Sequence, residues 1–124
     1  MFTKTLASAT LCLLLGLPVQ AHDLEIGSGI FCDTQQEVER FVALFDGDAT
    51  TAINTVNAEM KDPTACGFGT IALMRGPQVG SARTWSDTLH VYRVMVIGVV
   101  TAEGVKRTAP TPAYLIDRIK ERGA

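Results

Sequence analysis

The clearest hydrophobic pattern along the chain is helical and lies between residues 33 and 60. Asp33 and Gln36 have the spacing of a helix start, with one side chain capping the helix and the other closing a capping box. Apolar residues then recur at the helical period in two stripes separated by Gly47. The first stripe is Val38, Phe41, Val42 and Phe45, and the second is Ala49, Ala52, Ile53, Val56 and Met60. The pattern predicts two short helices joined by a tight turn, which is a helical hairpin.

After Cys66 the pattern changes to that of short β-strands. An apolar run at residues 71–74 ends at an arginine–glycine–proline turn, and residues 79–85 alternate weakly. Residues 90–101 form the strongest strand pattern, because they are rich in β-branched side chains. A glycine turn follows, and residues 105–108 can pair back on this strand.

The last segment, residues 112–120, fits two structures. Thr111 and Pro112 have the character of a helix start, and Gly123 that of a helix stop. Residues 113–116 equally fit a closing strand, which would cover an otherwise bare edge of the sheet. Both alternatives stay open. Taken together, the patterns predict an α+β fold: an N-terminal helical hairpin packed on a small bent antiparallel sheet, for which an SH3-like barrel is one form.

The first 21 residues have the layout of a secretory signal peptide. Lys4 is followed by an uncharged stretch with a dense apolar block at residues 11–15 and a small-x-small site ending at Ala21. The apolar run is shorter than the about 20 residues that cross a bilayer. We therefore expect cleavage after Ala21 and a periplasmic or secreted protein that is not inserted in the membrane. Residues 22–124 would form one domain, with residues 22–30 as a flexible arm.

The cysteines are interpreted in the light of this export. The chain has three, and Cys12 would leave with the signal peptide. Cys32 and Cys66 remain as a pair, and in an oxidising compartment a lone pair most simply forms a structural disulfide. Closing a loop of about 35 residues contributes roughly 3–4 kcal/mol by the chain-entropy relation.

Several of these stretches together resemble a group of small exported bacterial proteins of unknown function with one disulfide. The stretches are Gly29–Thr34 leading into Val38–Val42, Pro63–Cys66 with the second cysteine, and Val94–Thr101. The resemblance implies an exported protein with a capped helix, a disulfide and one apolar strand. It carries no catalytic residues to this chain.

Candidate catalytic groups are few in the predicted domain. His90 is the one histidine inside the folded part, and no Gly-x-Ser-x-Gly turn is present in the sequence. Asp87 lies three residues from His90, so in a strand the two side chains point to opposite faces. The sequence thus favours a non-enzymatic protein without a cofactor.

A copper site is the alternative function. Cleavage after Ala21 would leave His22 as the first residue, whose free amine and imidazole can chelate a metal together. His90 would supply a second imidazole, and this nitrogen-rich set suits Cu(II). The alternative is therefore a periplasmic copper-binding protein that uses His22 and His90.

The charge of the predicted domain is divided between its two halves. Residues 22–65 carry nine acidic and two basic side chains, a net charge of −7, whereas residues 66–124 carry four acidic and eight basic ones, a net charge of +4. The two halves either neutralise each other within one domain or leave a basic β surface that steers a partner. Such a surface would be made of Arg75, Arg83, Arg93, Lys106 and Arg107. We expect an exported binding or interaction module whose partner is an envelope component or another protein and not nucleic acid, from which export separates it.

Overall fold

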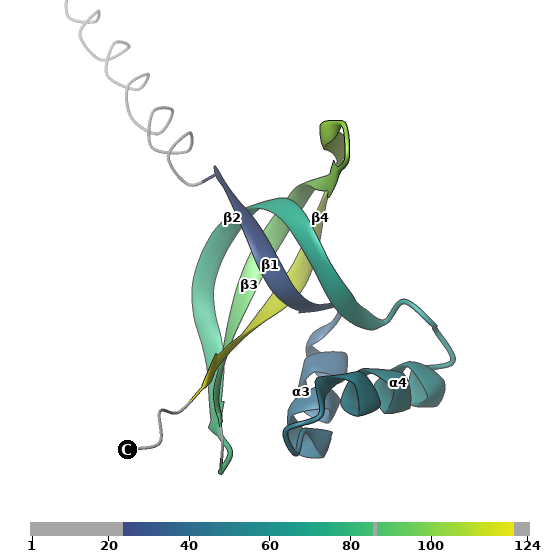
Figure 1. Ribbon diagram of the computed structural model, residues 1–124, viewed down its shortest axis with the longest axis vertical. Helices are drawn as coiled ribbons and strands as arrows, with labels where there is room; N and C mark the ends of the chain where they lie inside the picture. The colour runs from purple at the N-terminus through teal and green to yellow at the C-terminus, as the bar shows by residue number, and fades with distance from the viewer. Residues whose placement is uncertain (1–23, 86, 121–124) are drawn as a thin grey trace, which may run out of the picture.

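The computed structural model describes residues 24–85 and 87–120, and these form two helices and four strands (Figure 1). The elements follow in the order β1 (Leu24–Cys32), α3 (Gln35–Leu44), α4 (Ala49–Met60), β2 (Cys66–Arg83), β3 (Asp87–Thr101) and β4 (Gly104–Lys120). The predicted α+β class is confirmed. The predicted signal peptide at residues 1–21 and His22 lie outside the described residues.

The four strands form one antiparallel sheet in the order β1-β2-β3-β4, which closes into a ring because β1 also pairs with β4. This closing ladder is short and joins Ile30, Phe31 and Cys32 to residues 114–116 of β4. The pairings of β3 with β2 and with β4 contain register shifts. Such bulges bend and twist strands, which lets a strand of 18 residues curve around the ring. In Figure 1, β2 arches over β1 while the two helices lie together beside one end of the ring.

The predicted order of helices and sheet is wrong. The helical hairpin lies between β1 and β2 instead of preceding the sheet, and residues 24–30, expected in a flexible arm, belong to β1. The glycines in this segment make close packing possible. A Cβ atom at Gly27 would lie 3.1 Å from Leu73 Cδ2, and one at Gly29 would lie 3.0 Å from Leu115 Cδ1. These glycines therefore admit large interior side chains to the ring, and they do not indicate a mobile arm.

The ambiguous segment at residues 112–120 is a strand, the second half of β4. Its neighbouring residues Leu115 and Ile116 are both buried, at 0% and 1% exposure, and belong to different apolar clusters. Burial of consecutive residues on two sides is the pattern of a strand with both faces covered. Tertiary burial thus decides what the local helix signals left open.

The sheet separates two apolar cores. One lies inside the ring and is formed by Leu73, Val94, Ala113 and Leu115. The other lies between the outer face of the sheet and the helices, where Phe41 and Val56 are fully buried against residues of all four strands. The helices are therefore attached to the outside of the ring, and they leave its interior to the strands.

The start of α3 differs by one residue from the predicted one. Thr34, and not Asp33, is the N-cap: its hydroxyl accepts a hydrogen bond from the Glu37 amide at 3.2 Å, and Glu37 Oε1 accepts one from the Thr34 amide at 2.9 Å. This reciprocal pair is a capping box. It fixes the direction in which α3 leaves β1.

The disulfide between Cys32 and Cys66 is present, as predicted. The two cysteines are direct cross-strand partners at the end of β1 and the start of β2, with their Cα atoms 4.1 Å apart. The crosslink therefore closes the base of the helical insertion, because both helices lie in the loop between the two cysteines. Neither described helix is long and apolar enough to cross a membrane.

Candidate functional site

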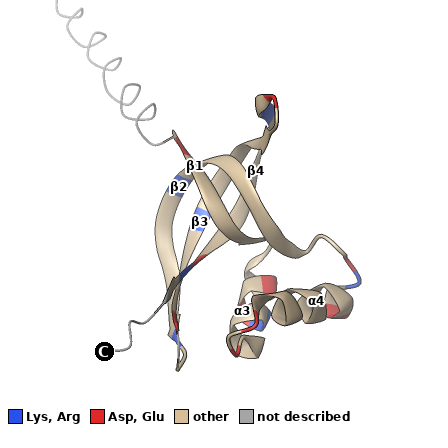
Figure 2. Ribbon diagram, viewed as in Figure 1, with Lys and Arg blue, Asp and Glu red and all other residues tan. Residues whose placement is uncertain are grey.

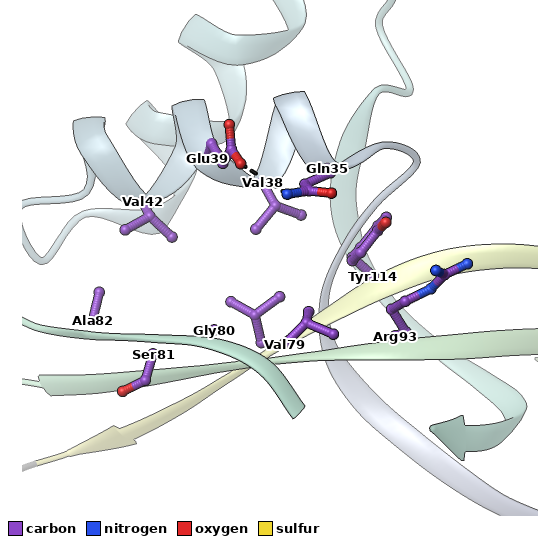
Figure 3. Close-up of a pocket in the computed structure, with 11 residues that line it drawn as sticks. Gln35, Val38, Glu39, Val42, Val79, Gly80, Ser81, Ala82, Arg93 and Tyr114 are labelled. Carbon is purple, nitrogen blue, oxygen red and sulfur yellow. Dashed lines mark hydrogen bonds between the residues drawn. The ribbon is translucent and has the colours of Figure 1, made fainter. Parts of the chain in front are cut away.

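A groove of about 380 Å³ lies between helix α3 and the region where β2 and β3 pair (Figure 3). Its apolar lining comes from both sides: Val38 and Val42 from the helix, and Val79, Ala82 and Val91 from the strands. The volume falls within the range of about 300–1,000 Å³ typical of small-molecule sites. The groove is therefore large enough to hold a small ligand against a mainly apolar surface.

The helical wall follows from the phase of the apolar stripe in α3. Val38 and Val42 are one turn apart and so lie on the same side of the helix. Phe41 points into the core and is fully buried, whereas Val42 is only partly buried. The apolar stripe of α3 therefore extends beyond the buried core, and Val38 and Val42 at its edge form the upper wall of the groove in Figure 3.

The strand wall follows from a bulge in β2. The pairing of β2 with β3 shifts register on both sides of Gln78, which places Val79 in an irregular stretch where this residue is 49% exposed. The next residue, Gly80, pairs with Val91 and has no side chain to cover it. Because of the bulge and the glycine, the apolar strand side of the groove, which includes Val79 and Val91, is not covered by other side chains of β2.

One end of the groove is polar. Arg93 and Tyr114 lie together there, with the guanidinium carbon of Arg93 5.8 Å from the centre of the Tyr114 ring (Figure 3). Within the described residues Arg93 forms no ion pair, whereas Glu39 on the rim accepts a hydrogen bond from Gln35 Nε2 at 3.0 Å. The groove therefore combines an apolar length with a cation at one end that is available to a ligand.

The five cations of the predicted basic surface do not come together. Figure 2 shows the lysines and arginines in blue, spread along the strands. Arg83 pairs with Thr88 near one end of β3, and Lys106 pairs with Val99 near the other end. These partners are separated by eleven residues along β3, which spans roughly 35 Å in an extended strand. Arg107 lies beside Lys106 in sequence, far from the groove. Of the five, only Arg93 lines the groove.

Arg75 is bound within the protein. Its guanidinium donates hydrogen bonds to Glu25 of β1 at 2.9 and 3.1 Å and to Asp117 of β4 at 3.2 Å, and it lies 4.5 Å from the centre of the Tyr92 ring. The hydrogen bond from Arg75 lowers the pKa of Glu25, and that bond raises the pKa of Arg75. Glu25 and Asp117 lie where β1 and β4 have stopped pairing, so Arg75 bridges the open part of the ring. Through these contacts Arg75 of β2 links β1 and β4 where the two strands no longer pair.

His90 lies in a row of cross-strand neighbours that could not be predicted from the sequence. Its cross-strand partners are Ser81 of β2 and Asp117 of β4, which places a serine, a histidine and an aspartate side by side. In the described structure, however, no hydrogen bond links the three side chains. The Asp117 carboxylate binds Arg75, and the His90 ring meets Tyr92 edge-to-face at 6.5 Å. The row has the residue types of a hydrolase triad without its hydrogen bonds.

The copper alternative gains no ligand set from the described residues. His22 lies outside them, and no group of three or more histidine, cysteine, aspartate or glutamate side chains suited to a metal ion occurs among them.

Asp87, the acidic candidate near His90, is fully buried and forms an ion pair with Arg118 at 3.3 Å. It is separated from His90 by three residues along β3, which places the two on opposite faces of the strand, as the sequence indicated.

The sequence did not reveal the groove, because its lining is assembled from segments far apart in the chain. Arg93 belonged to the predicted basic surface, but Gln35, Val79 and Tyr114 carried no functional signal. A partial signal exists in the weak alternation of residues 79–85 after the glycine–proline turn, since irregular strands often accompany bulges.

Comparisons with protein families, with curated proteins and with solved structures gave no match. The groove, its cation and the disulfide are therefore the observations that bear on function.

Proposed function

We propose that this protein is an exported, non-enzymatic binding module whose groove between α3 and the β2–β3 strands takes a small amphiphile with an anionic head group. The observation that carries the proposal is the position of Arg93, a cation without an ion pair in the described structure, at the end of an apolar groove. The apolar tail of the ligand would lie along Val38, Val42 and Val79. Its head group would meet Arg93.

The choice of an anionic head follows from the chemistry of the polar end. An arginine offers five donors and no acceptor, and its planar fork matches carboxylates and phosphates. Tyr114 and Gln35 add neutral polar groups beside it. Glu39 is also on the rim, but it is hydrogen-bonded to Gln35. A cationic head group would be placed beside Arg93 and repelled by it.

Export is supported by two independent features. The signal-like layout of residues 1–21 predicts passage across a membrane. The disulfide between Cys32 and Cys66 suggests an oxidising compartment, since such bonds are rare in the cytosol. A periplasmic or secreted binding protein would meet amphiphiles of the cell envelope, which fits the partner class expected from the sequence.

We also propose an SH3-like barrel as the class of the ring. Its strands are antiparallel, strongly bulged and closed on themselves, which supports this assignment. The helical insertion between β1 and β2 would then be the addition that supplies one wall of the groove.

The test is calorimetric titration of the purified protein with decanoate, and with decanol and decyltrimethylammonium as neutral and cationic probes. We expect decanoate to bind, decanol to bind more weakly and the cation not to bind. Arg93→Gln should weaken decanoate binding about fivefold to tenfold, because it removes one partly screened charged hydrogen bond.

The matched control is Lys106→Gln, which removes an exposed cation far from the groove and should leave the affinity unchanged. Val79→Asp should abolish binding by placing an acid in the apolar floor, and the exposure of Val79 makes this change compatible with folding. Equal effects of Arg93→Gln and Lys106→Gln, or no binding of decanoate at all, would refute the proposal.

A further inference from the structure

Strand β1 has one long edge that no described strand covers. Residues Leu24–Gly29 pair with β2 on one side, but the ladder between β1 and β4 ends at Ile30. Beyond that point β1 and β4 diverge and leave a hollow of about 310 Å³, lined in part by Ser28 and Phe68. An uncovered edge presents backbone donors and acceptors in a row, and such a row is a template for another strand.

The other uncovered edge of the ring is protected. Among the residues that the structure describes, the first half of β4, Gly104–Pro112, pairs with β3 only. It contains two prolines, which cannot donate to a ladder, and two exposed cations, Lys106 and Arg107, which oppose strand addition by charge. This half of β4 thus has the residues with which proteins prevent edge-to-edge pairing.

The edge of β1 has none of these protections. Its sequence from residue 24 to 29, Leu-Glu-Ile-Gly-Ser-Gly, contains no proline and no cation, and its ladder with β2 runs without a register shift. Leu24 and Ile26 are 53% and 55% exposed. Glu25 is the one charged residue in this segment, and Arg75 of the same chain neutralises it. An unbulged, apolar edge of this kind favours the addition of a strand.

We propose that the edge of β1 pairs in antiparallel fashion with the same edge of a second copy of this chain, which forms a two-fold symmetric dimer. Identical edges are complementary in an antiparallel pair, because residue i meets residue j and residue j meets residue i. The internal Glu25–Arg75 ion pair removes the like-charge repulsion that an unpaired glutamate would cause across the axis. Leu24 and Ile26 of each copy would cover those of the other.

The primary test is sedimentation velocity of the purified protein over a wide range of concentrations. We expect a monomer–dimer equilibrium, and we expect Ile26→Lys to shift it to monomer by adding a cation to the apolar edge. The matched control is Val105→Lys, the same replacement at a residue of β4 with 51% exposure, which should dimerise like the unchanged protein. A protein that is monomeric up to its solubility limit, or an Ile26→Lys variant that dimerises normally, would overturn the proposal.

Amide hydrogen exchange on the unchanged protein gives a second test that does not depend on the folding of a variant. Exchange at residues 24–29 should slow as the concentration rises, while exchange at residues 104–112 should not change. A dimer that leaves exchange at residues 24–29 unaltered uses another face, and that result also overturns the proposal.

Discussion

Replacing Arg75 with methionine tests whether the open part of the ring is held by charge. Methionine keeps an unbranched side chain but removes the guanidinium, which bridges Glu25 and Asp117 and lies over the ring of Tyr92. The side chains are 28–38% exposed, so solvent screens the ion pairs and each contributes about 0.2–1 kcal/mol. The contact of the cation with the ring of Tyr92 adds about 0.5–1 kcal/mol. We expect Arg75→Met to lower the free energy of unfolding by about 1–3 kcal/mol at pH 7, measured by urea unfolding.

The pH dependence of this loss separates charge from packing. The pKa of Glu25 lies below its ordinary value of 4.5 because Arg75 donates hydrogen bonds to it. A carboxyl with a lowered pKa in the folded state stabilises the protein above its unfolded pKa, and this stabilisation is lost as the pH falls through the folded pKa. The difference between the unchanged protein and Arg75→Met should therefore be full at pH 7 and shrink as the pH falls below 4.5.

The control for this experiment is Arg40→Met, which removes a similar arginine–glutamate pair, Arg40 with Glu59, from the exposed surface of the helices. We expect a smaller loss there, because this pair is more exposed and bridges two helices that pack through an apolar core. A loss at Arg75→Met that stays constant from neutral to acidic pH would refute the reasoning, since it would come from packing or from the contact with Tyr92 and not from the ion pairs.

Two further predictions concern the framework of the ring. Replacing both Cys32 and Cys66 with alanine should lower the free energy of unfolding, measured in urea, by about 3–4 kcal/mol, because the unfolded chain regains the conformational entropy of a loop of 34 residues. Chemical reduction of the unchanged protein should give a similar loss. An unaltered urea midpoint after reduction would contradict this prediction. Gly98→Ala should lower the melting temperature, because the new Cβ would lie 2.9 Å from the backbone oxygen of Lys106, at a cost of about 1–3 kcal/mol. Gly67→Ala, where a Cβ meets nothing within 4 Å, is the matched control, and equal shifts at the two glycines would count against the described packing.

The helices could be predicted from the sequence because their signals are local. The apolar stripes of α3 and α4 repeat at the helical period, and Gly47 separates them. The capping box lies one residue later than predicted, at Thr34 and Glu37 instead of Asp33 and Gln36, since neighbouring polar residues are both capable of capping. The disulfide could also be predicted from the sequence, because only two cysteines follow the predicted cleavage site.

The strands could be predicted only in part because their signals depend on contacts between distant segments. The turn signal at residues 75–77 predicts the end of a strand, yet β2 continues through it as a bulge, from Cys66 to Arg83. Gly27 and Gly29 indicate flexibility when the sequence is considered alone, and in the ring they admit Leu73 and Leu115. Curvature and interior packing, which no local pattern encodes, decide both cases.

Ion pairs within the protein neutralise part of the positive charge carried by residues 66–124. Arg75 pairs with Glu25 of the acidic half, and Arg118 pairs with the buried Asp87. Neutralisation within the protein therefore accounts for these two cations, whereas Arg93, Lys106 and Arg107 form no ion pairs within the described residues. Position then distinguishes the three, since Arg93 alone among them borders the groove.

The most direct test of the groove as the binding site is methyl chemical-shift mapping by NMR during titration with decanoate. We predict shifts for the methyl groups of Val38, Val42, Val79 and Val91, which line the groove, and none for Val94 in the ring interior or Val105 on the far hairpin. Shifts confined to Val94 and Val105, or an unchanged spectrum at saturating decanoate, would contradict the assignment of the groove.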